Sequence, residues 1–516
     1  MTIVDAIVGF VLSPWAAALG LAALVFFYLH PYLVTYGHLR DIPAPFGAQL
    51  SNLWLLSTAR RGKRYALVDE VHKRLGPVVR IAPNHISILD DEAIPLIYGH
   101  GNGLVKSSFY DAFVSIRRGL FNTRDRAEHA RKRKIISHTF SPASISQFEP
   151  YVHENLLLFV TQWDVLIKNA PPSQRGAAYL DCLKWFNYLA FDIIGDLAFG
   201  APFGMLSSGA DVAEVRASPD APPQYTPAIE ILNRRGEVSA TLGCLPELRA
   251  WAAWLPDPFF TQGMAAVAHL AGIAVARVKG RLANPPDVDR TDLLEHLMSG
   301  RDEQGRPLGR DELTAEALTQ LIAGSDTTSN TSCALLYYVA RTPHVLAALH
   351  VELDSALPAG VDVPSYEMVR NLPYLQAIVH ETMRVHSTSG IGLPRQVPPD
   401  SPGITIRGRV YPPGTVLSVP TYSVHHSREI WGEDTDEFRP ERWDPAVLTP
   451  RQKKAFIPFS VGPRACVGRN VAEMEMKLIA ATWARRYHVE LRQGPMQTRE
   501  GFLRKPLALE IGIRMR

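Results

Sequence analysis

The pattern of apolar and polar positions predicts a mainly helical chain with a few short strands. Apolar residues recur at helical spacing over residues 470–486 and along a segment that starts near Glu312. Residues 78–81 and 85–89 alternate instead, which predicts a hairpin with Pro83 and Asn84 in its turn. Short strands are also expected at 404–407, 410–411 and 416–419, with a turn at 412–414 between the last two.

The sequence shows neither repeats nor linkers that would divide the chain into further domains. Segments 217–224, 284–290 and 301–310 are rich in proline, glycine or charge and are expected to be surface loops between helices. No internal repeat is evident. The expected fold class is therefore mainly α with small β-sheets (α+β), in one globular domain over residues 51–516.

The N-terminal segment is apolar enough to cross a membrane. Residues 6–29 contain no charged side chain, and a helix of this length spans the hydrocarbon core. A cleaved signal peptide is the alternative, but no basic residue precedes the run and it exceeds the usual core of about 7 to 15 residues. We expect an anchor over residues 1–36, with Pro14 able to kink it, and a proline-containing hinge over 37–50.

Charge and cysteine content narrow the classes of partner. Asp5 precedes the apolar run and Arg40, Arg60, Arg61, Lys63 and Arg64 follow it, so the positive-inside rule predicts a cytoplasmic globular part. The 54 basic and 51 acidic residues give a net charge of +3, which offers no electrostatic case for nucleic acid. The four scattered cysteines form no CxxC pair, which argues against a disulfide framework or a zinc knuckle.

The sequence Phe-Ser-Val-Gly-Pro-Arg-Ala-Cys-Val-Gly at residues 459–468 carries the strongest chemical signal. Gly462 can take a positive φ angle, and Gly468 lets the backbone pass close to a flat ligand. Cys466 lies just before a predicted helix and near two arginines, both of which favour a thiolate. A buried structural cysteine behind a turn is the alternative.

This loop resembles the haem-binding loop of the cytochrome P450 family at every fixed position of Phe-x-x-Gly-x-Arg-x-Cys-x-Gly. The resemblance implies a cytochrome P450 fold and a haem b (iron protoporphyrin IX) whose iron takes Cys466 as axial ligand. Phe459 would shield the sulfur, and Arg464 would pair with a haem propionate. Further propionate contacts would come from Arg395, Arg133 and His129, the last replacing a tryptophan that many members have and carrying a charge that depends on pH. A solvated basic face is the alternative for Arg131 or Lys132, and such a face would suit an acidic redox partner.

A second segment, residues 323–328 (Ala-Gly-Ser-Asp-Thr-Thr), is expected to interrupt the long helix. A mid-helix glycine costs about 1 kcal/mol relative to alanine, and hydroxyl side chains compete for backbone carbonyls. A kink or a close helix crossing would explain the pattern equally well. Beside the cysteine loop, it resembles the oxygen-binding groove of the family. That implies haem contacts at Ala323 and Gly324 and proton delivery by Asp326 and Thr327.

A third motif concerns stability. Glu381 and Arg384 lie three apart on a predicted helix, where they can pair, although most such pairs are solvated. Together with Phe-Arg-Pro-Glu-Arg-Trp at 438–443, they resemble the Glu-Arg-Arg structural lock of the family, with Arg442 as third member. Trp443 stands where many members have phenylalanine.

Longer segments narrow the resemblance. Residues 101–125, 191–205, 233–244 and 498–507 look like the fungal benzoate 4-monooxygenases. This likeness implies para-hydroxylation of benzoate with O2, at the endoplasmic reticulum membrane. Only 50 residues follow Cys466, too few for a flavin domain, so NADPH would act through a separate NADPH–cytochrome P450 reductase. The alternatives are another aromatic or lipid substrate, or a non-catalytic haem sensor or carrier, which would not need a proton relay.

Such a substrate must be held by its carboxylate at the far end of a small apolar slot, because burying an unpaired carboxylate is costly. The candidate anchors are Arg117, Arg118, Arg234, Arg235, Ser387, Thr388 and Ser389. The candidate walls are Phe109, Tyr110, Phe113 and Phe502. The alternative roles are a surface salt bridge for each arginine and a packed core for each aromatic residue.

Overall fold

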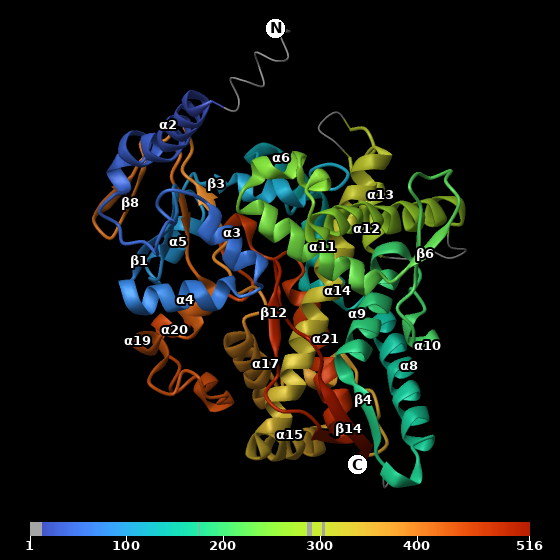
Figure 1. Cartoon of the computed structure of the whole chain (residues 1–516). Helices are drawn as coiled ribbons and strands as arrows, with labels where there is room; N and C mark the ends of the chain where they lie inside the picture. The colour runs from blue at the N-terminus through green and yellow to red at the C-terminus, as the bar shows by residue number, and fades with distance from the viewer. Residues whose placement is uncertain (1–12, 175, 286–291, 302–304) are drawn as a thin grey trace.

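The computed structural model describes residues 13–174, 176–285, 292–301 and 305–516 (Figure 1). Long helices fill one side of the molecule, and a small mixed sheet with short helices forms the other. The longer helices are α2 (Pro14–His30), α3 (Leu53–Arg60), α4 (Arg64–Leu75), α6 (Arg126–Ser137), α8 (Glu149–Lys168), α9 (Cys182–Phe199), α11 (Ala228–Gly243), α12 (Pro258–Ala283), α14 (Arg310–Arg341), α15 (Pro343–Ala356), α17 (Pro373–His386) and α21 (Arg469–Arg486).

Shorter helical segments connect these elements. They are α5 (Ala93–Tyr98), α7 (Pro142–Ile145), α10 (Met205–Ser208), α13 (Leu293–Ser299), α16 (Tyr366–Val369), α18 (Thr421–His425), α19 (Arg428–Trp431) and α20 (Pro450–Ala455), with 3-10 turns that include η3 (Ser108–Phe113), η8 (Pro440–Trp443) and η9 (Gly462–Arg464). The mainly helical prediction is confirmed.

The strands form small sheets. The largest has the order β1 (Val78–Ala82), β2 (His85–Ile88), β10 (Val416–Ser418), β7 (Arg395–Gln396) and β3 (Val105–Lys106). Another joins β11 (Tyr487–Leu491), β14 (Glu510–Met515) and β4 (Ala178–Asp181). Two-stranded pairs are β5 (Ala213–Val215) with β6 (Gln224–Thr226), β8 (Ile404–Ile406) with β9 (Arg409–Tyr411), and β12 (Thr498–Glu500) with β13 (Arg504–Pro506).

The predicted strands are present, but β10 does not pair with β9, the strand before it in the chain. β1 and β2 pair antiparallel, as the alternation at 78–89 indicates. The turn at 412–414 leads from β9 into β10, but these two strands belong to different sheets, because β10 pairs with β2 and β7. Segment 217–224 joins β5 to β6 rather than two helices. Residues 286–291 and 302–304 of the other two expected loops lie outside the described residues.

Helix α14 is the central element of the helical side. It packs against α9, α12, α17 and α21, and most of its residues are buried (Figure 1). Contrary to the expected interruption at 323–328, the helix runs without a break from Arg310 to Arg341. Gly324 meets α9 instead, since a Cβ there would lie 2.6 Å from Ile194 Cδ1. The glycine therefore permits the close helix crossing that the sequence left open.

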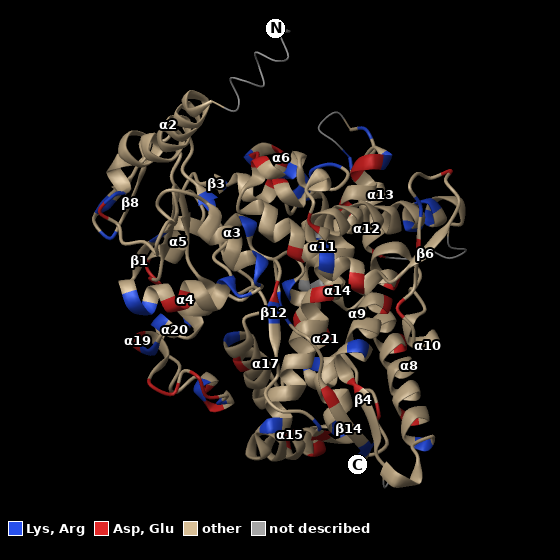
Figure 2. Ribbon diagram, in the orientation of Figure 1, with Lys and Arg blue, Asp and Glu red and all other residues tan. Residues whose placement is uncertain are grey.

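The N-terminal helix stands apart from this core. α2 and the following turn have a mean hydropathy of 1.8 over residues Pro14–Thr35, and none of the residues of α2 is buried. Its ribbon is tan in Figure 2, because it contains no Lys, Arg, Asp or Glu. Pro14 occupies the first turn of α2 behind the N-cap Ser13, a position where proline fits without kinking a helix. Residues 1–12, the start of the expected anchor, lie outside the described residues.

A second helix, α12, is also long and apolar enough to cross a membrane. α12 has a mean hydropathy of 1.5, but half of it is buried against the rest of the protein. It packs on α11 and α14, which accounts for its apolar residues as a core face. Within the described residues, α2 is therefore the helix that suits a membrane anchor.

Glu381 on α17 lies at the centre of the predicted structural lock. Arg384 donates two hydrogen bonds of 2.8 Å to its two carboxylate oxygens, and Arg442 donates one of 3.1 Å. Trp443 Nε1 donates a further bond of 3.0 Å to the same carboxylate. The replacement of phenylalanine by Trp443 thus adds a fourth member to this buried cluster, a role that the sequence motif did not reveal.

Candidate active site

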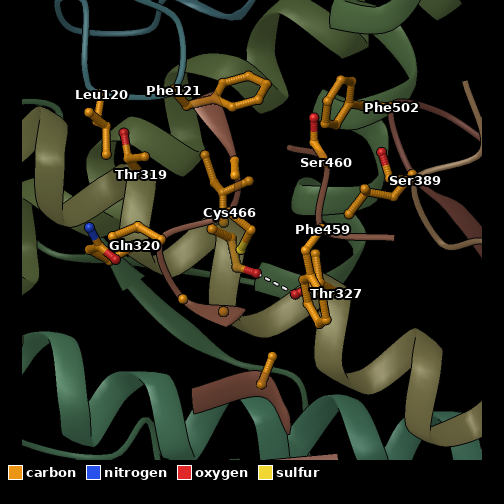
Figure 3. Close-up of a pocket in the computed structure, with 18 of the residues that line it drawn as sticks. Leu120, Phe121, Thr319, Gln320, Thr327, Ser389, Phe459, Ser460, Cys466 and Phe502 are labelled. Carbon is orange, nitrogen blue, oxygen red and sulfur yellow. Dashed lines mark hydrogen bonds between the residues drawn. The ribbon is translucent and has the colours of Figure 1, made fainter. Parts of the chain in front are cut away.

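A cavity of about 350 Å³ lies between α14 and the 459–468 loop (Figure 3). Cys466 faces this cavity, three residues before α21 begins, and its backbone N–H donates to the Phe459 carbonyl over 2.9 Å. Gly462 has a φ of 74°, and a Cβ there would lie 2.0 Å from the Tyr98 carbonyl oxygen. The loop therefore requires glycine at 462, as its sequence predicts.

The space around Cys466 suits a flat metal-bearing ligand. Cys466 is exposed and lines the cavity. The surrounding protein raises the pKa of the thiol, whereas the backbone of Gly468 and the charges of Arg133 and Arg469 lower it. A metal ion bound at the sulfur would displace the thiol proton. A Cβ on Gly468 would meet nothing closer than 3.9 Å, so the backbone leaves open space there.

Five basic residues line the same part of the cavity: Lys106, His129, Arg133, Arg395 and Arg464. None of them makes an ion pair with an acidic side chain among the described residues. Arg464 donates to the carbonyls of residues 123–125, and Arg133 donates to the Ala465 carbonyl over 2.6 Å. Buried cations without counter-ions are costly, so this wall fits an anionic ligand.

The pKa values reflect this crowding of positive charge. Burial and the neighbouring Arg395 lower the pKa of Arg464 to about 10. Burial and the same arginines lower the pKa of Lys106 well below its usual range. For His129, burial and Arg464 lower the pKa to about 3, so this histidine is neutral at physiological pH. The sequence had suggested a charge that depends on pH in that range. The two carboxylates of a haem and a cysteine-ligated iron fit this donor set.

Lys106 is a site residue that the sequence analysis missed. Its Nζ donates to the Phe121 carbonyl and lies 4.2 Å from the centroid of the Tyr110 ring. Strand β3 pairs Lys106 with Arg395 on β7, and this sheet register brings the lysine to the cavity. No local pattern distinguishes it from a surface lysine.

Comparison with known proteins decides the family. A sequence model described as Cytochrome P450 matches residues 43–512. The chain belongs to the cytochrome P450 family. It is 62% identical over 510 residues to "Benzoate 4-monooxygenase bphA" of Aspergillus niger, covering 98% of both chains. It is 32% identical over 486 residues to a "Cytochrome P450 monooxygenase" of Aspergillus terreus, covering 90% of this chain and 93% of the relative.

As a cytochrome P450, the protein uses haem, and α14 forms one wall of the haem cavity. Ala323, Gly324 and Thr327 line it, and Thr327 Oγ1 donates to the Ala323 carbonyl over 2.6 Å. Asp326 is not among the lining residues; its Oδ1 accepts a bond of 3.0 Å from Asn330 Nδ2. The hydroxyl and the carboxylate thus both have partners on their own helix, at positions beside the cavity.

Glu475 on α21 is a second residue that the sequence analysis missed. It lines the cavity of this cytochrome P450 and accepts a hydrogen bond of 2.8 Å from Thr328 Oγ1. Burial raises its pKa to about 7, partly opposed by the bond from Thr328. Its sequence signal is an acidic side chain on the apolar face of the helix that follows Cys466.

Arg131 and Lys132 do not form the solvated face that was considered for them. Lys132 is buried, and its Nζ donates to Glu312 over 2.6 Å and to Glu316 over 2.9 Å, both on α14. Arg131 pairs with Glu128 and Glu312. These bonds fasten α6 to α14, so a docking face for a redox partner cannot rest on Lys132.

Some of the candidate substrate residues line the cavity and others do not. Arg117, Arg235, Thr388, Ser389, Tyr110, Phe113 and Phe502 line it. Arg118, Arg234, Ser387 and Phe109 do not. Arg118 pairs with Asp111 over 2.6 Å, and Ser387 Oγ donates to the Arg384 carbonyl over 2.7 Å. Phe109 packs behind the wall, with its ring centroid 5.3 Å from that of Phe113.

Proposed function

We propose that this cytochrome P450 is a monooxygenase that hydroxylates benzoate at the para position with O2. The observation that carries the proposal is the 62% identity, over 98% of both chains, to a benzoate 4-monooxygenase of Aspergillus niger. An apolar cavity that contains a few polar groups and a cysteine suits a small aromatic acid.

In this proposal Cys466 Sγ would hold the haem iron, and Phe459, which lines the same cavity, would shield the sulfur. Lys106, His129, Arg133, Arg395 and Arg464 would hold the propionates, with Ala323, Gly324 and Gly468 against the ring. The bound haem supplies the redox chemistry that activates dioxygen. Thr327 and Asp326 deliver protons to the cavity, and aromatic side chains hold the substrate and exclude water.

In this proposal electrons come from NADPH through a separate NADPH–cytochrome P450 reductase. Residues 1–36 serve as a single-pass anchor in the endoplasmic reticulum membrane. Residues 37–50 form the hinge, and the catalytic domain of residues 51–516 faces the cytoplasm. The exposed apolar surface of α2 supports the anchor.

Benzoate is expected to bind the ferric holoenzyme and shift the haem toward high spin, because a substrate in the cavity would exclude water from the iron. An optical titration measures this shift, and turnover with the reductase should yield 4-hydroxybenzoate. A carbon monoxide spectrum of the reduced protein verifies the thiolate ligand. If that spectrum is normal but benzoate causes no shift and no product, the substrate is another aromatic compound or a lipid.

Thr327→Ala is expected to leave haem and benzoate binding unchanged while hydroxylation falls at least about tenfold for each NADPH consumed. The variant removes the cavity-lining hydroxyl without adding bulk. The comparison is product formed per NADPH oxidised, with Thr319→Ala as a matched control on the same helix. Unchanged coupling in Thr327→Ala would show that the hydroxyl delivers no proton.

A further inference from the structure

Arg235 on α11 is a buried cation with few partners. Its side chain lines the cavity and only 5% of the residue is exposed. Nη2 donates one hydrogen bond, of 3.0 Å, to the Phe113 carbonyl. The Nε–H is buried and has no hydrogen-bond partner, and no acidic side chain among the described residues lies within ion-pair distance of the guanidinium.

Burial without a counter-ion has an electrostatic cost. It lowers the pKa of Arg235 to about 10, with a smaller contribution from Arg249, yet the group stays charged at neutral pH. The ring of Phe113 lies 5.3 Å from the guanidinium carbon and offers only a weak cation–π contact. An arginine in such a place leaves hydrogen-bonding capacity and charge uncompensated until an anion arrives.

This cation is separate from the group that faces Cys466. Arg395 and Arg464 lower the pKa of Lys106, and Arg464, Lys106, Arg133 and Arg395 lower that of His129, whereas the charged group that lowers the pKa of Arg235 is Arg249. The cavity therefore has two cationic regions. The five-residue group suits the haem propionates, which leaves Arg235 for a different anion.

The surroundings of Arg235 fit an aromatic ring. Phe113, Phe121 and Phe502 form mutual edge-to-face contacts, with ring centroids 5.1 to 5.7 Å apart. Figure 3 shows Phe121 and Phe502 in the part of the cavity above Cys466. A fourth aromatic ring can pack against these three while a charged substituent reaches the arginine.

We propose that Arg235 binds the carboxylate of the aromatic acid substrate and makes the enzyme select anions over neutral compounds of the same shape. The inference rests on the proposed function and assigns its substrate anchor. A guanidinium holds a carboxylate through charge-assisted hydrogen bonds, and the free Nε–H supplies one such donor. The carboxylate in turn neutralises the buried charge.

The other candidates fit this role less well. Arg117 also lines the cavity, but its Nη1 lies 3.7 Å from Glu312 and its side chain is 48% exposed. Thr388 Oγ1 lies 2.8 Å from Thr331 Oγ1 and carries no charge. Ser389 lines the cavity as a neutral hydroxyl, which alone does not compensate a carboxylate.

The test compares benzoate with benzamide, its neutral isostere, by spin-state titration of the ferric holoenzyme. Arg235→Met should weaken benzoate binding about 100-fold, because truncating one partner of a buried charge pair has effects of this size. Benzamide affinity should change less than about threefold. Arg235→Lys should lie between, since it keeps the charge but loses the planar fork. Arg234→Met, next along α11 and not lining the cavity, is the matched control and should behave as wild type.

Two outcomes of this comparison would overturn the assignment. Equal losses for benzoate and benzamide would mean that Arg235 only supports the η3 turn, which ends at Phe113, and unchanged benzoate binding would place the anchor elsewhere. If Arg235→Met does not incorporate haem, Arg235→Lys replaces it, and the loss of benzoate affinity is again compared with the loss of benzamide affinity. If wild type does not bind benzoate, the proposed substrate fails, and phenylacetate against phenylacetamide then tests Arg235. If the enzyme bound phenylacetate no more tightly than phenylacetamide, the role of Arg235 as a carboxylate anchor would be wrong.

Discussion

Cys466→Ser is expected to abolish the monooxygenase activity while leaving the protein folded. Cys466 is exposed and lines the cavity, and serine fills nearly the same volume, so packing is little changed. A hydroxyl is not a thiolate and does not donate the electron density that a cysteinate gives to haem iron. The measurements are product formation and the carbon monoxide spectrum of the reduced protein, which should lose its thiolate signature.

Cys244→Ser provides the control. Cys244 is also free, but it is buried, donates weakly to the Ala240 carbonyl and does not line the cavity. This variant should keep both the thiolate spectrum and turnover. A thiolate spectrum that survives in Cys466→Ser would mean that another residue ligates the iron, and the assignment of the 459–468 loop would be wrong.

Glu381→Ala is expected to lower the free energy of unfolding by about 3 to 5 kcal/mol, enough to prevent haem incorporation in much of the protein. The side chains of Glu381 and Arg384 are fully buried, and that of Arg442 is almost so. Removing the carboxylate leaves Arg384 without its counter-ion and Trp443 Nε1 without its acceptor, while Arg442 keeps only its contact with Asp434, at 3.2 Å. Denaturant unfolding and the yield of haem protein measure the effect.

The chain contains a matched control for this pair. Glu367 and Arg370 have the same spacing and lie 2.9 Å apart, but their side chains are 72% and 48% exposed. Glu367→Ala should change the free energy of unfolding by less than about 1 kcal/mol, since water solvates both charges. Similar effects of the two substitutions would show that burial of the 381 pair does not govern its contribution.

Local rules make part of this protein predictable from its sequence. The hairpin at 78–88 follows from alternation around a proline–asparagine turn, and the structure has it. The need for glycine at 462 follows from the turn that places Cys466 before α21. The cysteine loop and the Glu-Arg-Arg motif also indicate the family, because their residue types can be read from the sequence at the expected positions.

Interactions between distant segments decided the rest. The sequence presents Arg117 and Arg235 as equal candidates. In the structure Arg117 lies near Glu312 on another helix, while Arg235 is buried on α11 with no counter-ion among the described residues. In the sequence Lys132 resembles a surface lysine, but the packing of α6 on α14 pairs it with Glu312 and Glu316. The sequence determined which residue types are available and the local turns. The tertiary structure determined which charges are compensated, because burial and counter-ions depend on elements far apart in the chain.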